Sequence, residues 1–270
     1  MTTIQSTRSD QHSLRWAVTD AWAIAVRDLQ HWRQQPGTVI FNWVFPILIV
    51  LMFGLLFGGA IVVPEGTSYF EFLMPGMFAV TMLFGLETTM MAVTTDAAKG
   101  VTDRFRSMPM SASAVVLGRC IADMLNSVVG LAILAVTGLL LGWRWHGSLG
   151  AALAAFGLLL LLRFALLWVG IFMGLNAKGP ESVATIQILV WPVSFLSNVF
   201  VDPATMPAWL GAIAQWNPLS VTASAARALF ENAGTSGASE NVLLLAILMP
   251  LAITAVFLPL SVRKFRHLNQ

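Results

Sequence analysis

Six long apolar runs constrain what this chain can fold into more than any other feature of its sequence. Several reach the roughly 18–20 residues that an α-helix needs to cross a bilayer. A helix satisfies its own backbone hydrogen bonds in lipid, and the runs lack the alternating pattern of barrel strands, so each predicts a transmembrane helix. The predicted spans are approximately 38–58, 73–94, 115–141, 150–174, 183–200 and 241–261, and Pro192 interrupts the fifth.

Composition agrees with an integral membrane protein. Of the 270 residues, 57% are hydrophobic and 10% are charged, whereas soluble domains average about 45–50% and about 25%. The single cysteine, Cys120, excludes an internal disulfide and a multi-cysteine metal site. The first apolar run lacks a cleavage pattern, so we expect it to remain as an anchor. The chain then divides into an N-terminal segment, 1–37, and a single six-span domain, 38–270.

The positions of Lys and Arg predict the orientation of the chain, because these residues are enriched in cytoplasmic loops. Twelve of the 15 lie before the first span, between the second and third spans or at the start of the third (Arg119), between the fourth and fifth, or in the C-terminal tail. The remaining three are Arg144, Arg163 and Arg227. We therefore expect both termini, and the loop between the second and third spans, to face the cytoplasm.

The segment before the first span has the period of an amphipathic helix. Apolar residues between Leu14 and Trp32 share one face, polar ones lie opposite, and Pro36 follows. This pattern predicts a helix lying in the cytoplasmic membrane interface. An ordinary helix packed on another domain is the alternative. The residues expected to mark the interfacial helix are Trp22, Arg27, Trp32 and Arg33.

The stretch "DAAKGVTDRFRSMPMSASAVVLGR", residues 96–119, places charges between two apolar spans. A solvated loop would explain the charges alone. Val101, Phe105 and Met108, however, form a short apolar stripe at spacings of four and three. An aromatic anchor flanked by arginines is typical of a surface that docks in another protein. The residues of this predicted docking helix are Asp96, Lys99, Val101, Asp103, Arg104, Phe105, Arg106 and Met108.

The region 201–240 contains two apolar stretches that are each too short to span a bilayer, separated by Asn217 and Pro218. Proline is favoured at the first position of a helix. The pattern predicts a re-entrant helical hairpin in the outer leaflet, between the fifth and sixth spans, and a simple surface loop is the alternative. Its marker residues are Pro207, Trp209, Trp216, Asn217 and Pro218.

Two ionisable residues, Glu87 and Arg163, fall inside the second and fourth predicted spans. Charges in a bilayer are unfavourable unless they are paired or hydrated, so intramembrane ionisable residues are candidates for function. Either the two form an ion pair that locks the helices, or one of them lines a polar part of a translocation path. The sequence leaves both interpretations open.

Motifs for catalysis are missing from the sequence. It contains no G-x-x-x-x-G-K-[ST], no H-E-x-x-H and no G-x-S-x-G. Asp96, Asp103 and Asp123 could hold Mg²⁺ in a membrane phosphotransferase, but the Lys and Arg residues among them oppose a bare metal. We therefore expect neither a catalytic residue nor a metal site in this chain.

Two stretches resemble the ABC transporter type-2 permeases, in the daunorubicin-resistance and nodulation-factor export branch. One is "KGVTDRFRSMPMSASAVVLGRCIAD", with R-x-R-x-x-P followed by G-R at the start of the third span. The other is "PVSFLSNVFVDPATMPAWLGAIAQWNPLSVTASAARAL", with M-P-x-W-L and then N-P-L before an arginine. The predicted spans and the N-terminal helix also agree with this family.

The resemblance implies an all-α permease subunit in a bacterial cell membrane, working as a homodimer with two copies of a separate ATPase subunit. ATP and Mg²⁺ would bind to that partner, and this chain would need no cofactor of its own. The family's coupling helix corresponds to about 96–108 here and its interfacial helix to about 14–35. Closure of the ATPase would act on both and turn the pore outward.

The cargo implied is an amphipathic or lipid-like compound: a drug or antibiotic, a lipid or a glycolipid. Two other functions stay open at the level of the sequence. An ion-coupled secondary transporter could use Glu87 as its protonation site, and a membrane scaffold would move no cargo.

Overall fold

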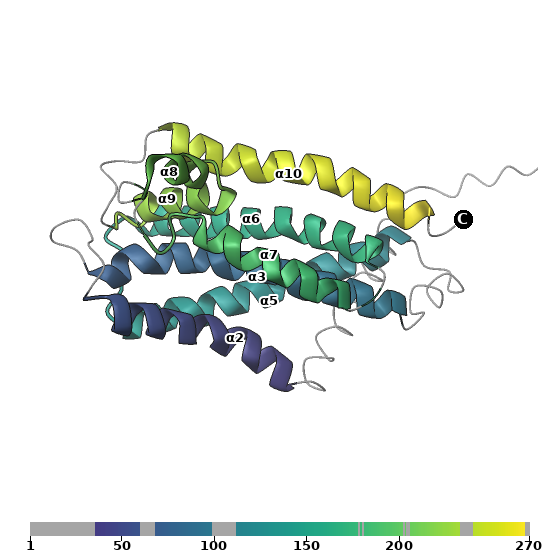
Figure 1. Ribbon diagram of the computed structural model, residues 1–270, viewed down its shortest axis with the longest axis horizontal. Helices are drawn as coiled ribbons and strands as arrows, with labels where there is room; N and C mark the ends of the chain where they lie inside the picture. The colour runs from purple at the N-terminus through teal and green to yellow at the C-terminus, as the bar shows by residue number, and fades with distance from the viewer. Residues whose placement is uncertain are drawn as a thin grey trace, which may run out of the picture.

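A computed structural model describes residues 36–59, 68–98, 112–177, 179, 181–201, 203, 206–232 and 240–267, and its regular secondary structure is helical (Figure 1). The predicted interfacial helix, with Trp22, Arg27, Trp32 and Arg33, lies outside these residues. So do the docking residues from Lys99 to Met108. The elements are α2 (Pro36–Leu51), a π-helical continuation η1 (Met52–Phe57), α3 (Tyr69–Ala98), α5 (Ala112–Leu140), α6 (Leu149–Asn176), α7 (Glu181–Phe195), α8 (Ala208–Gln215), α9 (Pro218–Leu229) and α10 (Glu240–His267).

The long helices form a bundle with α3 and α6 at its centre. In their most apolar 18-residue stretches, most residues of α3 and α6 are buried, whereas few residues of α2 and α10 are. A helix that remains apolar on its exposed face suits a lipid environment. In Figure 1 the charged C-terminal end of α10 and the α8–α9 pair lie at opposite ends of the bundle.

Five described helices are long and apolar enough to cross a membrane, and they match predicted spans one to four and six. Their candidate spans are Val39–Phe57, Tyr69–Ala98, Leu117–Leu140, Leu149–Asn176 and Asn241–Phe265.

The predicted fifth span, 183–200, differs from the observed helix. The 15 residues of α7 make a helix of about 22 Å, against a bilayer core of about 30 Å. The amide of Asn217 donates to the carbonyls of Val193 and Leu196, at 2.8 Å and 3.2 Å. These bonds occupy acceptors at the C-terminal end of α7, and the chain bends from there to Val201.

Two glycines let α6 approach α3 closely. A Cβ atom at Gly170 would lie 2.9 Å from the carbonyl oxygen of Leu86, and one at Gly174 would lie 2.8 Å from Cβ of Val93. The spacing is that of a small-x-x-x-small motif, which brings membrane helices into backbone contact. The central helix pair is therefore positioned by backbone contact as well as by side-chain packing.

The predicted hairpin corresponds to α8 and α9. Pro207 caps α8, and α9 begins at Pro218, with the side chain of Asn217 accepting from the Leu219 amide at 2.9 Å. α9 is buried against α3, α6 and α10. Trp209 and Trp216, by contrast, are 67% and 72% exposed. Tryptophan is enriched at membrane–water interfaces, so the exposure of both side chains is compatible with such an interface.

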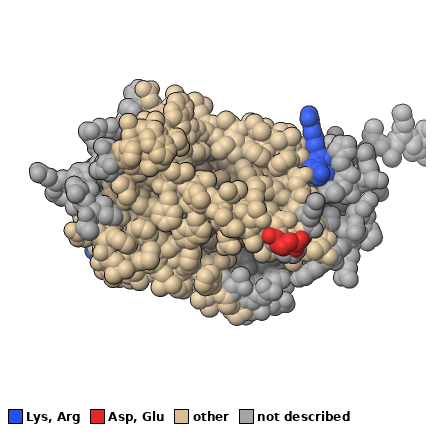
Figure 2. All heavy atoms as spheres, in the orientation of Figure 1, with Lys and Arg blue, Asp and Glu red and all other residues tan. Residues whose placement is uncertain are grey.

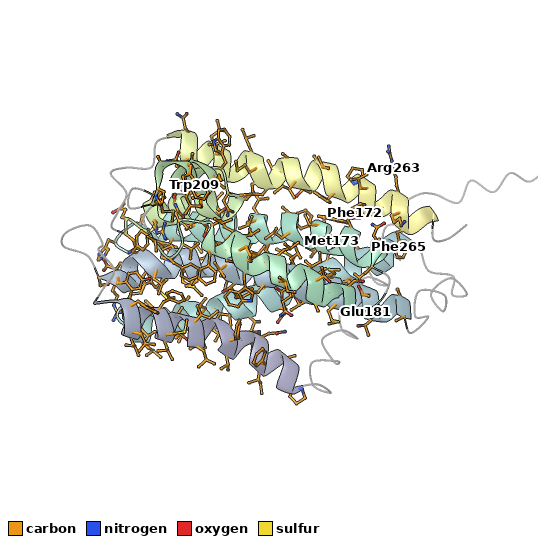
Figure 3. All side chains as sticks on the ribbon, in the orientation of Figure 1. Phe172, Met173, Glu181, Trp209, Arg263 and Phe265 are labelled. Carbon is orange, nitrogen blue, oxygen red and sulfur yellow. The ribbon has the colours of Figure 1, made fainter. Side chains whose placement is uncertain are left out.

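On the face that Figure 2 draws, most of the visible charged side chains lie at one end, while Glu71, Arg144 and Glu231 lie at the other end of the described bundle. Figure 2 shows an almost uncharged surface, with blue and red side chains towards the C-terminal end of α10. Figure 3 places Glu181 and Arg263 at that end and Trp209 at the other. We call these the charged end, where Asp96, Arg119, Glu181 and Arg263 lie, and the hairpin end, where α8 and α9 lie.

Candidate functional site

A buried arginine joins the three helices α3, α5 and α6. Arg163 lies in the middle of α6 and is only 1% exposed. Its Nε donates to Oγ of Ser127 on α5, and its Nη2 donates to Oγ1 of Thr89 on α3, both at 2.8 Å. A guanidinium in an apolar bundle must be hydrogen-bonded and paired, so these contacts are required for its burial.

Asp123 on α5 supplies the balancing charge. Its Oδ2 lies 3.7 Å from Nη2 of Arg163 and 2.7 Å from Oγ1 of Thr89. The Thr89 hydroxyl can therefore accept from Arg163 and donate to Asp123, which joins the two charges through one side chain. We refer to Gly85, Thr89, Asp123, Ser127 and Arg163 as the arginine cluster.

Gly85 provides the space for the guanidinium. A Cβ atom there would lie 2.5 Å from Nε and 2.7 Å from Cζ of Arg163. The hydrogen bonds of Nε and Nη2 hold the guanidinium in place, so it cannot move aside without losing a partner. Glycine is needed at position 85 because the side chain of Arg163 approaches the backbone of α3 closely there.

Alanine at Gly85 is therefore expected to destabilise the permease fold by about 1–3 kcal/mol, the usual cost of overpacking a core. The matched control is Gly157→Ala on α6, where a Cβ would meet nothing within 4 Å. Thermal unfolding of both purified variants in detergent measures the difference. Equal melting temperatures for the two variants would contradict the role assigned to Gly85.

An open cavity of about 270 Å³ adjoins the cluster. Ser127 and Gly85 belong both to its lining and to the arginine cluster. The cavity lies between α2, α3, α5 and α7, and many of its lining residues are polar or small. Its lining residues are Phe41, Asn42, Trp43, Phe45, Thr81, Met82, Phe84, Gly85, Glu87, Thr88, Asn126, Ser127, Gly130, Gln187 and Trp191.

Glu87 lies in the lining of this cavity and not in the arginine cluster. No hydrogen bond or ion pair joins Glu87 to Arg163, both of which are described residues. The mutual ion pair that the sequence left open is therefore not formed, because Asp123 on α5 occupies the place of the counter-charge. Oε1 of Glu87 is buried without a hydrogen-bond partner among the described residues.

A second ion pair joins α3 and α5 at the charged end. Nη1 of Arg119 on α5 lies 2.6 Å from Oδ2 of Asp96 on α3, and both side chains are partly buried. The pair joins the helix that ends before segment 99–111 to the helix that begins after it. Asp96 and Asp123 thus each face a guanidinium. A carboxylate that is paired in this way is a poor ligand for a metal ion.

Sequence reasoning selected Arg163 and Glu87 but missed the partners of Arg163. Three polar residues, Arg119, Asp123 and Ser127, recur at spacings of four along the third span. That period puts them on one helix face, which would have indicated a polar contact with neighbouring spans. The role of Gly85 has no comparable signal, because a single glycine in an apolar run is common.

Known proteins resemble this chain over most of its length. The model of the family described as "ABC-2 type transporter" matches residues 19–230. The daunorubicin resistance ABC transporter permease protein DrrB1 of Streptomyces coeruleorubidus is 35% identical over 244 residues, which cover 90% of this chain and 84% of that protein. The putative transport permease ycf38 of Porphyra purpurea is 26% identical over 208 residues, 76% of this chain and 71% of that protein.

The family match, the identity to the DrrB1 permease and the five membrane-crossing helices agree with one another. This protein is therefore a multi-pass membrane permease that belongs to the ABC-2 type transporter family.

Proposed function

We propose that this chain is the membrane subunit of an ATP-driven exporter, in which two copies form the pore and a separate ATPase subunit, also in two copies, supplies the energy. Membership of the ABC-2 family supports this proposal, as does the 35% identity to a daunorubicin resistance permease. The sequence contains no P-loop motif. ATP and Mg²⁺ would then bind to the partner, and this chain would hold no cofactor.

In this proposal α7 and the segment up to Val201 together form the fifth of six spans, and the charged end faces the cytoplasm. Arg119, Arg263 and Lys264 support that orientation, since Lys and Arg favour the cytoplasmic side. The hairpin of α8 and α9 would then occupy the outer leaflet, with Trp209 and Trp216 at the interface.

The observation that carries the proposed mechanism is the 2.6 Å ion pair between Asp96 and Arg119. It ties together the two helices that flank segment 99–111, so a force applied to that segment would move α3 and α5 as one unit. The arginine cluster continues this connection, because it joins the same two helices to α6 beside the cavity. Movement of the ATPase would thereby reach the cavity through rigid contacts.

Replacing both Arg104 and Phe105 with alanine is expected to uncouple ATP hydrolysis from export without unfolding the permease. The reason is the predicted docking helix, whose aromatic anchor and flanking charge would seat in a cleft of the ATPase. ATPase activity and cargo uptake are measured in inside-out proteoliposomes that contain both subunits. Arg144→Ala, on the opposite side in our topology, is the control. Export at the unaltered rate in the double variant would exclude this docking site.

A secondary transporter remains the second candidate, because the unpartnered Oε1 of Glu87 could exchange a proton. The two functions differ in their energy source. Uptake that requires the ATPase and ATP supports the exporter, whereas uptake driven by a proton gradient in permease-only vesicles supports the secondary transporter. A phosphotransferase is less well supported, since Asp96 and Asp123 already face guanidinium groups. We propose an amphipathic or lipid-like cargo, either a drug or antibiotic, or a lipid or glycolipid.

A further inference from the structure

We propose that the cavity beside the arginine cluster binds organic ammonium ions that carry an apolar or aromatic body, with Glu87 as the acceptor for the ammonium group. The inference rests on the proposed function, because it names the class of cargo that such an exporter would accept. It depends on three features of the cavity: its charge, an unsatisfied acceptor and a wall of aromatic rings.

The cavity carries a negative charge when the Glu87 carboxyl group is ionised. Among the described residues that line it, Glu87 alone is ionisable. Arg163 lies behind the wall, where its guanidinium is 1% exposed and faces the carboxylate of Asp123 at 3.7 Å. The positive charge of Arg163 is thus balanced by Asp123, and the carboxylate of Glu87 is left without a counter-charge in the described structure. A cationic ligand complements this arrangement, whereas an anionic ligand would be repelled.

Glu87 also offers an unused hydrogen-bond acceptor. Its Oε1 is buried and has no partner among the described residues. A buried carboxylate oxygen without a donor is unfavourable, so a bound N–H group would gain the full strength of a charge-assisted hydrogen bond. Gln187 and Thr88 line the same cavity and add further oxygen acceptors for an ammonium group.

The opposite part of the lining is aromatic. The rings of Phe45, Phe84 and Trp191 contact one another, with centroid distances of 5.7 Å, 5.9 Å and 5.5 Å. Together they offer apolar surface to a ligand body, and their faces attract a nearby cation. An aromatic wall next to one carboxylate is a combination that recognises amines.

The order of residues along the helices separates the polar part from the aromatic part. On α3, Glu87 lies one turn beyond Phe84 towards the charged end, and on α7, Gln187 lies one turn before Trp191. These two helices run in opposite directions, since α3 ends and α7 begins at the charged end (Figures 1 and 3). Glu87 and Gln187 are therefore at the same level, and both aromatic residues lie nearer to the hairpin end. A ligand with an ammonium head and an aromatic tail fits this arrangement.

The test compares 4-phenylbutylammonium with pentylbenzene, in which a methyl group replaces the ammonium. Binding to the full-length permease in lipid nanodiscs is measured by equilibrium dialysis, with empty nanodiscs as the blank for partitioning into lipid. We expect saturable binding of the ammonium compound and none of pentylbenzene. Glu87→Gln should lower the affinity for the ammonium compound about 10- to 100-fold, because one charge-assisted hydrogen bond is lost. Glu87→Asp should retain part of the affinity.

Two further variants separate a binding role from a general loss of structure. Trp191→Leu should also weaken binding, whereas Glu181→Gln, which removes an exposed carboxylate at the start of α7, should leave it unchanged. Unaltered affinity in Glu87→Gln, or equal saturable binding of pentylbenzene, would overturn the proposal. The assay contains neither ATP nor ATPase, so its failure would leave the proposed exporter standing, and a failure of ATP-driven transport would leave the binding result intact.

Discussion

Replacing Arg163 with methionine is expected to remove most of the folded permease from the membrane. Arg163 supplies donors to Thr89 and Ser127 and the counter-charge for Asp123. Methionine fills a similar volume but leaves the Asp123 carboxylate uncompensated. Breaking a buried pair in this way costs about 3–5 kcal/mol, and a protein of ordinary stability has only about 5–15 kcal/mol in total. The amount of folded protein is measured by fluorescence-detected size exclusion after detergent extraction.

Second-site changes identify the partner of Arg163. Adding Asp123→Asn to Arg163→Met should restore part of the folded protein, since the unpaired charge is removed while the new amide oxygen can still accept from Thr89. Adding Glu87→Gln to Arg163→Met should restore nothing, because Glu87 does not contact the guanidinium. Recovery with Glu87→Gln instead of Asp123→Asn would contradict the arginine cluster and support the original Glu87–Arg163 pair.

Replacing Arg227 with methionine is expected to release the hairpin of α8 and α9 from the bundle. Arg227 is 3% exposed and donates to the carbonyls of Phe72, Asn198 and Val199 at 2.9 Å, 3.0 Å and 3.2 Å. Its guanidinium also lies 4.0 Å from the ring centroid of Phe72. Methionine would leave these carbonyls without their donor, and each buried unsatisfied acceptor costs about 1–3 kcal/mol. Because several such bonds are lost, we expect Arg227→Met to reduce the stability of the fold about as much as Arg163→Met does.

Arg144→Met is the matched control for this change. Arg144 also donates to backbone carbonyls, those of Leu139 and Trp143, but its side chain is on an exposed part of the hairpin end. Water can replace the donor there, so we expect little change in stability. Thermal unfolding and limited proteolysis between Val201 and Asn217 are measured for both variants. Similar melting temperatures for the two would show that Arg227 does not anchor the hairpin.

The apolar runs predicted the membrane helices well because a bilayer leaves a chain few alternatives. Backbone groups in lipid must be satisfied within the helix, so length and hydropathy alone identify α3, α5, α6 and α10. The starts of α8 and α9 could also be predicted from nearby residues, since Pro207 and Asn217–Pro218 lie where these helices begin. The position at which α7 ends could not be predicted from neighbouring residues. It depends on Asn217, which is 21 residues beyond Leu196 and bonds to its carbonyl.

The candidate site shows the same division. Hydropathy alone singled out Glu87 and Arg163, because a charged residue in an apolar span is visible in the sequence. Hydropathy could not say which charge faces which, since α3, α5 and α6 can be rotated about their axes without changing their composition. The close contact of α6 with α3 at Gly170 and Gly174 restricts that rotation. It directs Arg163 towards Thr89 and Asp123, and it leaves Glu87 in the cavity.

The sequence by itself therefore determined the class of the protein, its membrane helices and the residues that need a polar partner. These properties follow from local free energies of transfer and from the backbone. Only the tertiary structure decided the partners, because a hydrogen bond of 2.7 Å between Thr89 and Asp123, which are 34 residues apart in the chain, depends on how their two helices are packed. Packing made Asp123 the counter-charge of Arg163 and left the carboxylate of Glu87 available for a ligand.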